Sequence, residues 1–90
     1  MRDIEFTTQF KRDMKRIEKR GWKRSELNAV LELLVHERSL PLTLRDHPLT
    51  GNWKGARDLH VRPDWVLIYR IKGKRLILER TGSHSDIFKK

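Results

Sequence analysis

The sequence predicts an α+β fold in which a small antiparallel sheet carries a helical hairpin on one face. Apolar residues recur with helical spacing through residues 8–38. Residues 57–80 instead alternate between apolar and polar in short segments separated by turn formers. The 90 residues match one domain, residues 1–90. A domain of this size has a core too small to enclose a large cavity, so we expect any active site to be a surface groove.

The N-terminal region predicts a short strand followed by an amphipathic helix. Residues 2–6 alternate, which places Ile4 and Phe6 on one face. The helix begins after Thr7 or Thr8, either of which can act as its N-cap. It ends at Gly21. Its apolar stripe consists of Phe10, Met14 and Ile17.

A second helix is predicted from Ser25, as N-cap, to about Arg38. Its apolar stripe is broad. Glu26 lies in the first turn, where a negative charge interacts favourably with the helix dipole. Only a few residues separate the two helices, so they form a hairpin whose apolar faces must cover another layer. The stripe comprises Leu27, Val30, Leu31, Leu34 and Val35.

The remaining residues predict three consecutive strands. Residues 40–52 are rich in turn formers and are expected to be a loop. The strands are expected at residues 57–62, 65–71 and 75–80. Residues 83–88 are expected to form one helical turn capped by Ser83. The predicted order is therefore β-α-α-β-β-β. The sheet face opposite the helices would be open to solvent and available for binding.

Composition narrows the range of functions. The chain carries a net charge of +9 and has no cysteine, which excludes disulfides, Cys-ligated metal sites and thiol nucleophiles. No apolar run approaches the length of a membrane span, so we expect a cytoplasmic protein with no membrane partner. The basic excess favours a polyanion, and nucleic acid is the commonest, with an anionic membrane or acidic protein as alternatives.

Three of the four histidines lie in the second half of the chain, among two aspartates and an arginine. Two histidines can supply the base that activates an RNA 2′-hydroxyl and the acid that protonates the leaving 5′-oxygen, and a guanidinium can bind the phosphate. Each histidine alone is more often an ordinary surface residue. The group comprises His47, His60, His84, Asp58, Asp64 and Arg80.

Other chemistries fit the sequence less well. The same His and Asp side chains are potential metal ligands, but no closely paired ligand motif is present. Ser83 and Ser85 lack a nucleophile-elbow motif, and the glycines form no phosphate-binding loop. Trp53, Trp65 and Phe88 lie near the polar candidates in sequence. Aromatic rings beside basic groups can stack on RNA bases, although core packing is the usual role of such residues.

Two stretches of the sequence resemble a known family. They are D-H-P-L-T-G-N-W-K-G-A-R-D-L-H-V-R-P-D-W at residues 46–65, continuing as V-L-I-Y, and E-R-T-G-S-H at residues 79–84. They resemble the YafQ branch of the RelE/ParE toxin superfamily. The likeness spans roughly residues 41–88, and the N-terminal half agrees with the family in length and element order.

The resemblance implies a RelE-like fold and a toxin of a type II toxin–antitoxin system. Such a toxin is an mRNA interferase that cleaves mRNA in the ribosomal A site without a metal or other cofactor. The implied partners are mRNA, the 70S ribosome and a DinJ- or RelB-like antitoxin. The antitoxin would be a ribbon-helix-helix dimer that forms a heterotetramer with the toxin, binds operator DNA and represses the operon.

The matching positions imply roles for individual residues, and none departs from the family pattern. The acid–base residues would be His47, His60, Asp64 and His84, with His84 as the proton donor. Contacts to phosphate or base, or ordering of the site, would fall to Asp58, Trp65, Arg80 and Phe88.

Two alternatives remain at this point. A ParE-like toxin that blocks gyrase would leave the histidines without a role, and a non-catalytic RNA- or ribosome-binding module would make them incidental.

The first helix also has a basic face, which is either solvated surface or a contact to ribosomal RNA. Its residues include Lys11, Arg12, Lys15 and Arg16.

Overall fold

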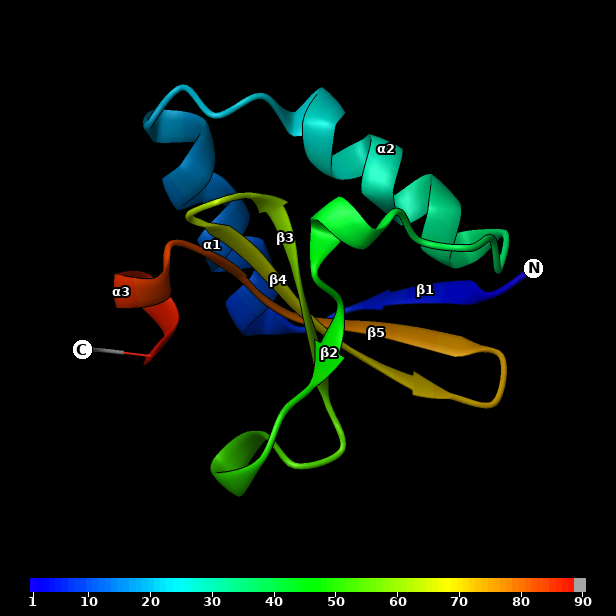
Figure 1. The fold of residues 1–90 in the computed structure, drawn as a ribbon. Helices are drawn as coiled ribbons and strands as arrows, with labels where there is room; N and C mark the ends of the chain where they lie inside the picture. The colour runs from blue at the N-terminus through cyan, green and yellow to red at the C-terminus, as the bar shows by residue number, and fades with distance from the viewer. Residues whose placement is uncertain (89–90) are drawn as a thin grey trace.

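The structure, a computed structural model, describes residues 1–88 and consists of a five-stranded sheet with three α-helices (Figure 1). The strand order in the sheet is β1-β5-β4-β3-β2. This arrangement confirms the predicted α+β class and the order of the main elements. The strands are β1 (Asp3–Phe6), β2 (His47–Pro48), β3 (Arg57–Arg62), β4 (Trp65–Lys72) and β5 (Arg75–Gly82).

The sheet differs from the prediction at its two edges. Strand β1 runs parallel to β5, so the sheet is mixed, with Ile4 opposite Leu76. Side-chain alternation reports which face a residue occupies and carries no information on strand direction. At the other edge, β2 forms inside the predicted loop because His47 pairs with Asp58 of β3. The same loop holds two short 3₁₀ turns, η1 (Leu42–Leu44) and η2 (Gly51–Trp53).

Helix α1 (Thr8–Lys19) begins and ends as its sequence predicts. Thr7 is the N-cap, and its side-chain oxygen accepts a hydrogen bond from the amide of Phe10 at 3.0 Å. Gly21 adopts a φ of 80°, which a residue with a side chain rarely takes. This conformation lets the Trp22 amide bond back to the carbonyl of Ile17 at 3.1 Å and closes the helix.

Helix α2 (Arg24–Val35) starts earlier and ends sooner than expected. Its N-cap is Lys23, which makes no side-chain capping bond, so the prediction of Ser25 as the cap was wrong. The helix ends where Glu37 takes a φ of 56°, and the amide of Arg38 returns to the carbonyl of Leu33 at 2.9 Å. This Schellman ending uses Glu in the position usually taken by Gly, so no sequence signal marked it.

Two apolar clusters lie on opposite faces of the sheet. The larger one joins α1 and α2 to the face formed by Leu59, Leu67 and Leu78, and it contains the indole of Trp65. The smaller one lies under η2 and α3 (His84–Phe88). It contains Ala56, Val66, Ile68 and Ile87.

The second cluster corrects the expectation of a fully open sheet face. Val66 and Ile68 are completely buried on that face. Helix α3 lies at the end of β5, at the left of Figure 1. The solvent-accessible part of the face includes polar residues of β2, β3 and α3, together with Arg70 of β4 and Glu79 of β5. Among residues 1–88, no helix has the length and apolar character needed to cross a membrane.

Candidate active site

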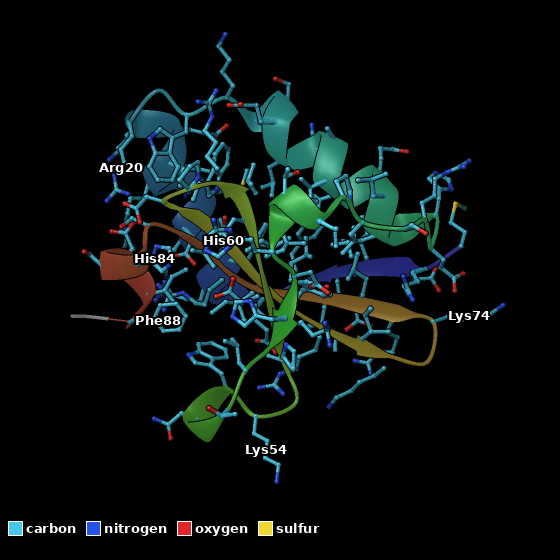
Figure 2. All side chains as sticks on the ribbon, in the orientation of Figure 1. Arg20, Lys54, His60, Lys74, His84 and Phe88 are labelled. Carbon is cyan, nitrogen blue, oxygen red and sulfur yellow. The ribbon has the colours of Figure 1, made fainter. Side chains whose placement is uncertain are left out.

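Three histidines from three different elements come together on the sheet face opposite α1 and α2. The Nε2 atoms of His60 on β3 and His84 on α3 lie 3.4 Å apart. The ring of His47 on β2 lies 6.4 Å from that of His60, measured between centroids. Figure 2 shows His60, His84 and Phe88 near one another, with Phe88 on α3. We call His47, His60 and His84 the histidine cluster.

Local structure explains how this cluster forms. Alternation along β3 turns Asp58 and His60 away from the helices, because their neighbour Leu59 points into the main core. The β2–β3 pairing brings His47 beside Asp58. Strand β5 ends at Gly82, and the following turn into α3 brings His84 over the end of β3.

His84 is held in one orientation by Asp64. The Asp64 carboxylate accepts from the His84 amide at 3.1 Å and from its Nδ1 at 2.7 Å. These hydrogen bonds lower the pKa of Asp64. A carboxylate accepts here, so Nδ1 of His84 carries a proton and its Nε2 is directed at His60. With a proton on one of the two Nε2 atoms, the pair presents one donor and one acceptor.

His47 is oriented by the backbone. Its Nδ1 lies 2.7 Å from the carbonyl oxygen of Arg45. A carbonyl can only accept, so Nδ1 is the donor, and Nε2 of neutral His47, which has no hydrogen-bond partner within residues 1–88, can accept. The loop is fixed by Asp46, which accepts from Tyr69 Oη and from Nη2 of Arg57 at 2.8 Å. Burial and the Asp46 contact raise the pKa of Tyr69, so this hydroxyl remains a donor.

Asp58 lies beneath the cluster and is only 3% exposed. Its Oδ1 and the Nδ1 of His60 are buried without a hydrogen-bond partner among residues 1–88. Burial raises the pKa of Asp58, and the positive charge available on the three histidines opposes that rise. The protonation of Asp58 therefore responds to the charge of the rings around it.

Arg80 and Trp65 occupy positions that suit ordering of the site better than contact with RNA. Nε and Nη2 of Arg80 both donate to Asp13, at 2.8 and 3.2 Å. Trp65 is 1% exposed, and its Nε1 donates to Thr81 Oγ1 at 2.9 Å. Of the two predicted roles, direct contact and ordering, Trp65 is placed for ordering.

Phe88 shares α3 with His84, and the two rings lie 6.2 Å apart. Phe88 is partly buried against the smaller apolar cluster. Its ring therefore contributes both to the anchoring of α3 and to the surface beside His84, so the core and stacking interpretations are compatible.

Helix α3 is attached to α1 by an ion pair. Nη1 and Nη2 of Arg20 donate to the Asp86 carboxylate at 2.5 and 2.8 Å. Asp86 also accepts from the Ser83 amide at 2.9 Å, while Ser83 Oγ accepts from the Asp86 amide at 3.1 Å. This capping box confirms Ser83 as the N-cap. A Cβ at position 82 would approach Asp86 Oδ2 to 2.8 Å, so Gly82 is required here.

The Arg20–Asp86 pair predicts an acid-sensitive anchor for α3. The hydrogen bonds from Arg20 lower the pKa of Asp86, so its contribution to stability is complete above its ordinary value of 3.8 and is lost as the pH falls through the lowered pKa. The melting-temperature difference between wild type and Asp86→Asn should therefore stay constant down to about pH 4 and shrink progressively below that pH. Asp3→Asn, at an exposed carboxylate with no ion pair among residues 1–88, is the control. A pH-independent difference would contradict this account.

Sequence reasoning missed several residues that support the site. Asp13 is completely buried and accepts from Arg80 and from the Thr81 amide at 3.1 Å. A signal was present, because Asp13 lies on the apolar stripe of α1 beside Phe10 and Met14, where a charged residue needs a partner. No comparable sequence signal indicated the supporting roles of Asp46, Asp86 and Arg45.

On α1, Lys11, Arg12 and Lys15 are exposed, as a binding face or a solvated face requires. Arg16 is more constrained, since it lies 3.8 Å from Asp13 and 3.6 Å from Asp86. No group of three or more metal-ligating side chains among residues 1–88 is arranged to hold a metal ion.

Comparison with known proteins identifies the family. Residues 2–89 match the model of a family described as the bacterial toxin of type II toxin-antitoxin system, YafQ. The chain belongs to the YafQ family. It is 46% identical to the mRNA interferase toxin YafQ of Escherichia coli K12 over 88 residues, which cover 97% of this chain and 96% of that protein.

Solved structures agree with the YafQ assignment. The crystal structure of YafQ from E. coli BL21(DE3) superposes with a TM-score of 0.92 at 44% identity, covering 98% of this chain and 99% of that one. The toxin in a crystal structure of the E. coli DinJ–YafQ complex gives a TM-score of 0.90 at 45% identity, with the same coverage. The resemblance noted in the two sequence motifs is thereby confirmed.

Proposed function

We propose that this YafQ-family chain is an mRNA interferase that cuts mRNA in the ribosomal A site by general acid–base catalysis. The observation that carries the proposal is the contact between His60 and His84, whose Nε2 atoms the fold holds 3.4 Å apart. Membership of the YafQ family and the name of the E. coli relatives, mRNA interferase toxin, support the reaction class.

The proposed chemistry needs no group outside this chain and the RNA. A neutral imidazole of the cluster takes the proton of a 2′-hydroxyl, and the 2′-oxygen attacks the adjacent phosphorus. The bond from phosphorus to the 5′-oxygen breaks, and His84 gives its proton to that oxygen. The products are a 2′,3′-cyclic phosphate and a 5′-hydroxyl. His47, His60 and Asp64 complete the acid–base set, and Asp58, Trp65, Arg80 and Phe88 order the site or contact the substrate.

The proposed partners follow from the family. E. coli YafQ has been crystallised with DinJ, so we propose a DinJ-like antitoxin for this chain. We further propose a heterotetramer built on an antitoxin dimer, which contacts operator DNA through the antitoxin alone and represses its own operon. The place of action would be the cytoplasm, on the 70S ribosome.

One assay tests the activity against the alternatives. Purified protein is added to ribosomes translating a defined mRNA, with and without EDTA, and to the mRNA alone. Cuts at the A site that persist in EDTA and require ribosomes support the proposal. Intact mRNA on occupied ribosomes would exclude it, and inhibition of gyrase in a parallel supercoiling assay would favour a ParE-like toxin.

The basic face of α1 is proposed to contact ribosomal RNA. Reversing the charges of Lys11, Arg12 and Lys15, together with Arg16, should weaken ribosome binding and flatten its dependence on salt, because fewer counterions are released. Binding is measured by co-sedimentation at several salt concentrations. A salt dependence equal to that of wild type would show that this face only solvates the helix.

A further inference from the structure

A groove beside the histidine cluster has no role in the chemistry described so far. It has a volume of about 400 Å³ and lies between η1 and the end of β3. This volume is in the range of small-ligand sites. His60 belongs both to the groove and to the cluster, so a molecule in the groove would lie next to the reacting atoms. The groove is lined by Thr43, Leu44, Arg45, His60, Val61, Arg62 and Pro63.

The arginines near the site differ in how far they are already neutralised. Arg80 donates through Nε and Nη2 to Asp13, and Arg62 donates through Nε to Glu26 at 2.8 Å. Arg45 has no carboxylate within 4.0 Å among residues 1–88, and its side chain is exposed in the groove. Of the three, Arg45 is the one whose guanidinium is free to bind a phosphate through two parallel hydrogen bonds.

The backbone of Arg45 is also unusual. It has a φ of 51° and a ψ of 40°, a left-handed conformation that is uncommon for a residue other than glycine. Its amide donates to the Leu42 carbonyl at 3.0 Å, and its own carbonyl receives Nδ1 of His47. One residue thus orients a histidine through its main chain and lines the groove with its side chain. Such conformations persist where surrounding contacts enforce them, often at functional sites.

We propose that this groove is an RNA subsite, in which Arg45 binds a phosphate adjacent to the one that is cut. Leu44, Val61 and Pro63 offer an apolar wall for the sugar or base of the same nucleotide. The proposal rests on the proposed function and extends it. It assigns the contact to that adjacent phosphate to Arg45, because Arg80 donates to Asp13 and Arg62 donates to Glu26.

The test compares Arg45→Asn with Arg38→Asn. Asparagine tolerates the left-handed conformation, so the first variant keeps the backbone contact to His47. Arg38 also has no carboxylate within 4.0 Å among residues 1–88 and lines no part of the groove, so its variant controls for the loss of one charge. The probe is a short fluorescent RNA with 2′-O-methyl groups, which cannot be cleaved, and binding is measured by anisotropy at several salt concentrations.

We expect Arg45→Asn to weaken RNA binding by about 10- to 100-fold and to reduce the salt slope by about one counterion. Arg38→Asn should change binding by less than about 2-fold. Equal losses in the two variants would overturn the proposal. So would unchanged RNA affinity with a reduced kcat on ribosomes, because Arg45 would then act only through His47.

The same experiment separates this proposal from the proposed function. Wild-type protein that binds the probe through Arg45 but never cuts mRNA on ribosomes would refute the interferase activity and retain the subsite. Wild-type protein that cuts mRNA, with Arg45→Asn binding the probe equally well, would retain the activity and refute the subsite.

Discussion

The His84→Ala variant is expected to cut ribosome-bound mRNA about 10²- to 10⁴-fold more slowly than wild type. The substitution removes the Nε2 atom that lies 3.4 Å from His60 and the Nδ1 atom that Asp64 holds. The proposed proton donor to the 5′-oxygen is then missing. Single-turnover cleavage on programmed ribosomes measures the loss directly.

Folding and ribosome binding of this variant should remain close to wild type, because the side chains of His84 and Asp64 are 43% and 71% exposed. The matched control is His36→Ala. His36 is an exposed histidine at the end of α2 whose Nε2 lies 3.1 Å from Glu32, remote from the cluster in sequence. Its removal should leave the rate unchanged. Full toxicity of His84→Ala in growing cells would show that another group donates the proton.

Asp13→Ala is expected to be the most destabilising substitution of a charged residue, at about 3–5 kcal/mol. Its carboxylate is completely buried, whereas the Arg80 side chain that donates to it is 17% exposed. Alanine would leave the guanidinium and the Thr81 amide without their acceptor. Urea unfolding measures the effect, which should appear as a lower midpoint with an unchanged slope.

A second pair of variants identifies the cause of this loss. Asp13→Asn keeps an oxygen that can accept from Thr81 but removes the charge opposite Arg80, so it should cost less. The double variant Asp13→Ala with Arg80→Ala removes both charges and should recover part of the loss, since no buried charge remains unpaired. A loss below about 1 kcal/mol for Asp13→Ala would contradict this description of the ion pair.

The sequence predicted the features that depend on local pattern. Spacing and alternation of apolar residues located α1, α2 and the three strands β3, β4 and β5. The grouping of His47, His60 and His84 in the second half of the chain, beside Asp58, Asp64 and Arg80, indicated acid–base chemistry. Each of these inferences uses residues close in the chain.

Features that depend on long-range pairing were not predictable. The parallel register of β1 with β5 joins residues far apart in the sequence, and the Asp13–Arg80 pair does the same. The left-handed conformation of Arg45 is imposed by η1 and by the position of His47, and arginine itself has no preference for it. The residues that hold the histidine cluster in place are therefore brought together by the tertiary fold.

The pairing of β1 with β5 has a consequence for synthesis of the protein. In residues 1–88, β1 hydrogen-bonds to β5 alone, so this edge of the sheet stays open until residues 75–78 have emerged from the ribosome. Helix α3, which carries His84, follows later still. A nascent chain that has not reached β5 contains two of the three clustered histidines and no attachment point for the third. The ribosome that makes this protein therefore translates at least residues 1–84 before an assembled site can exist.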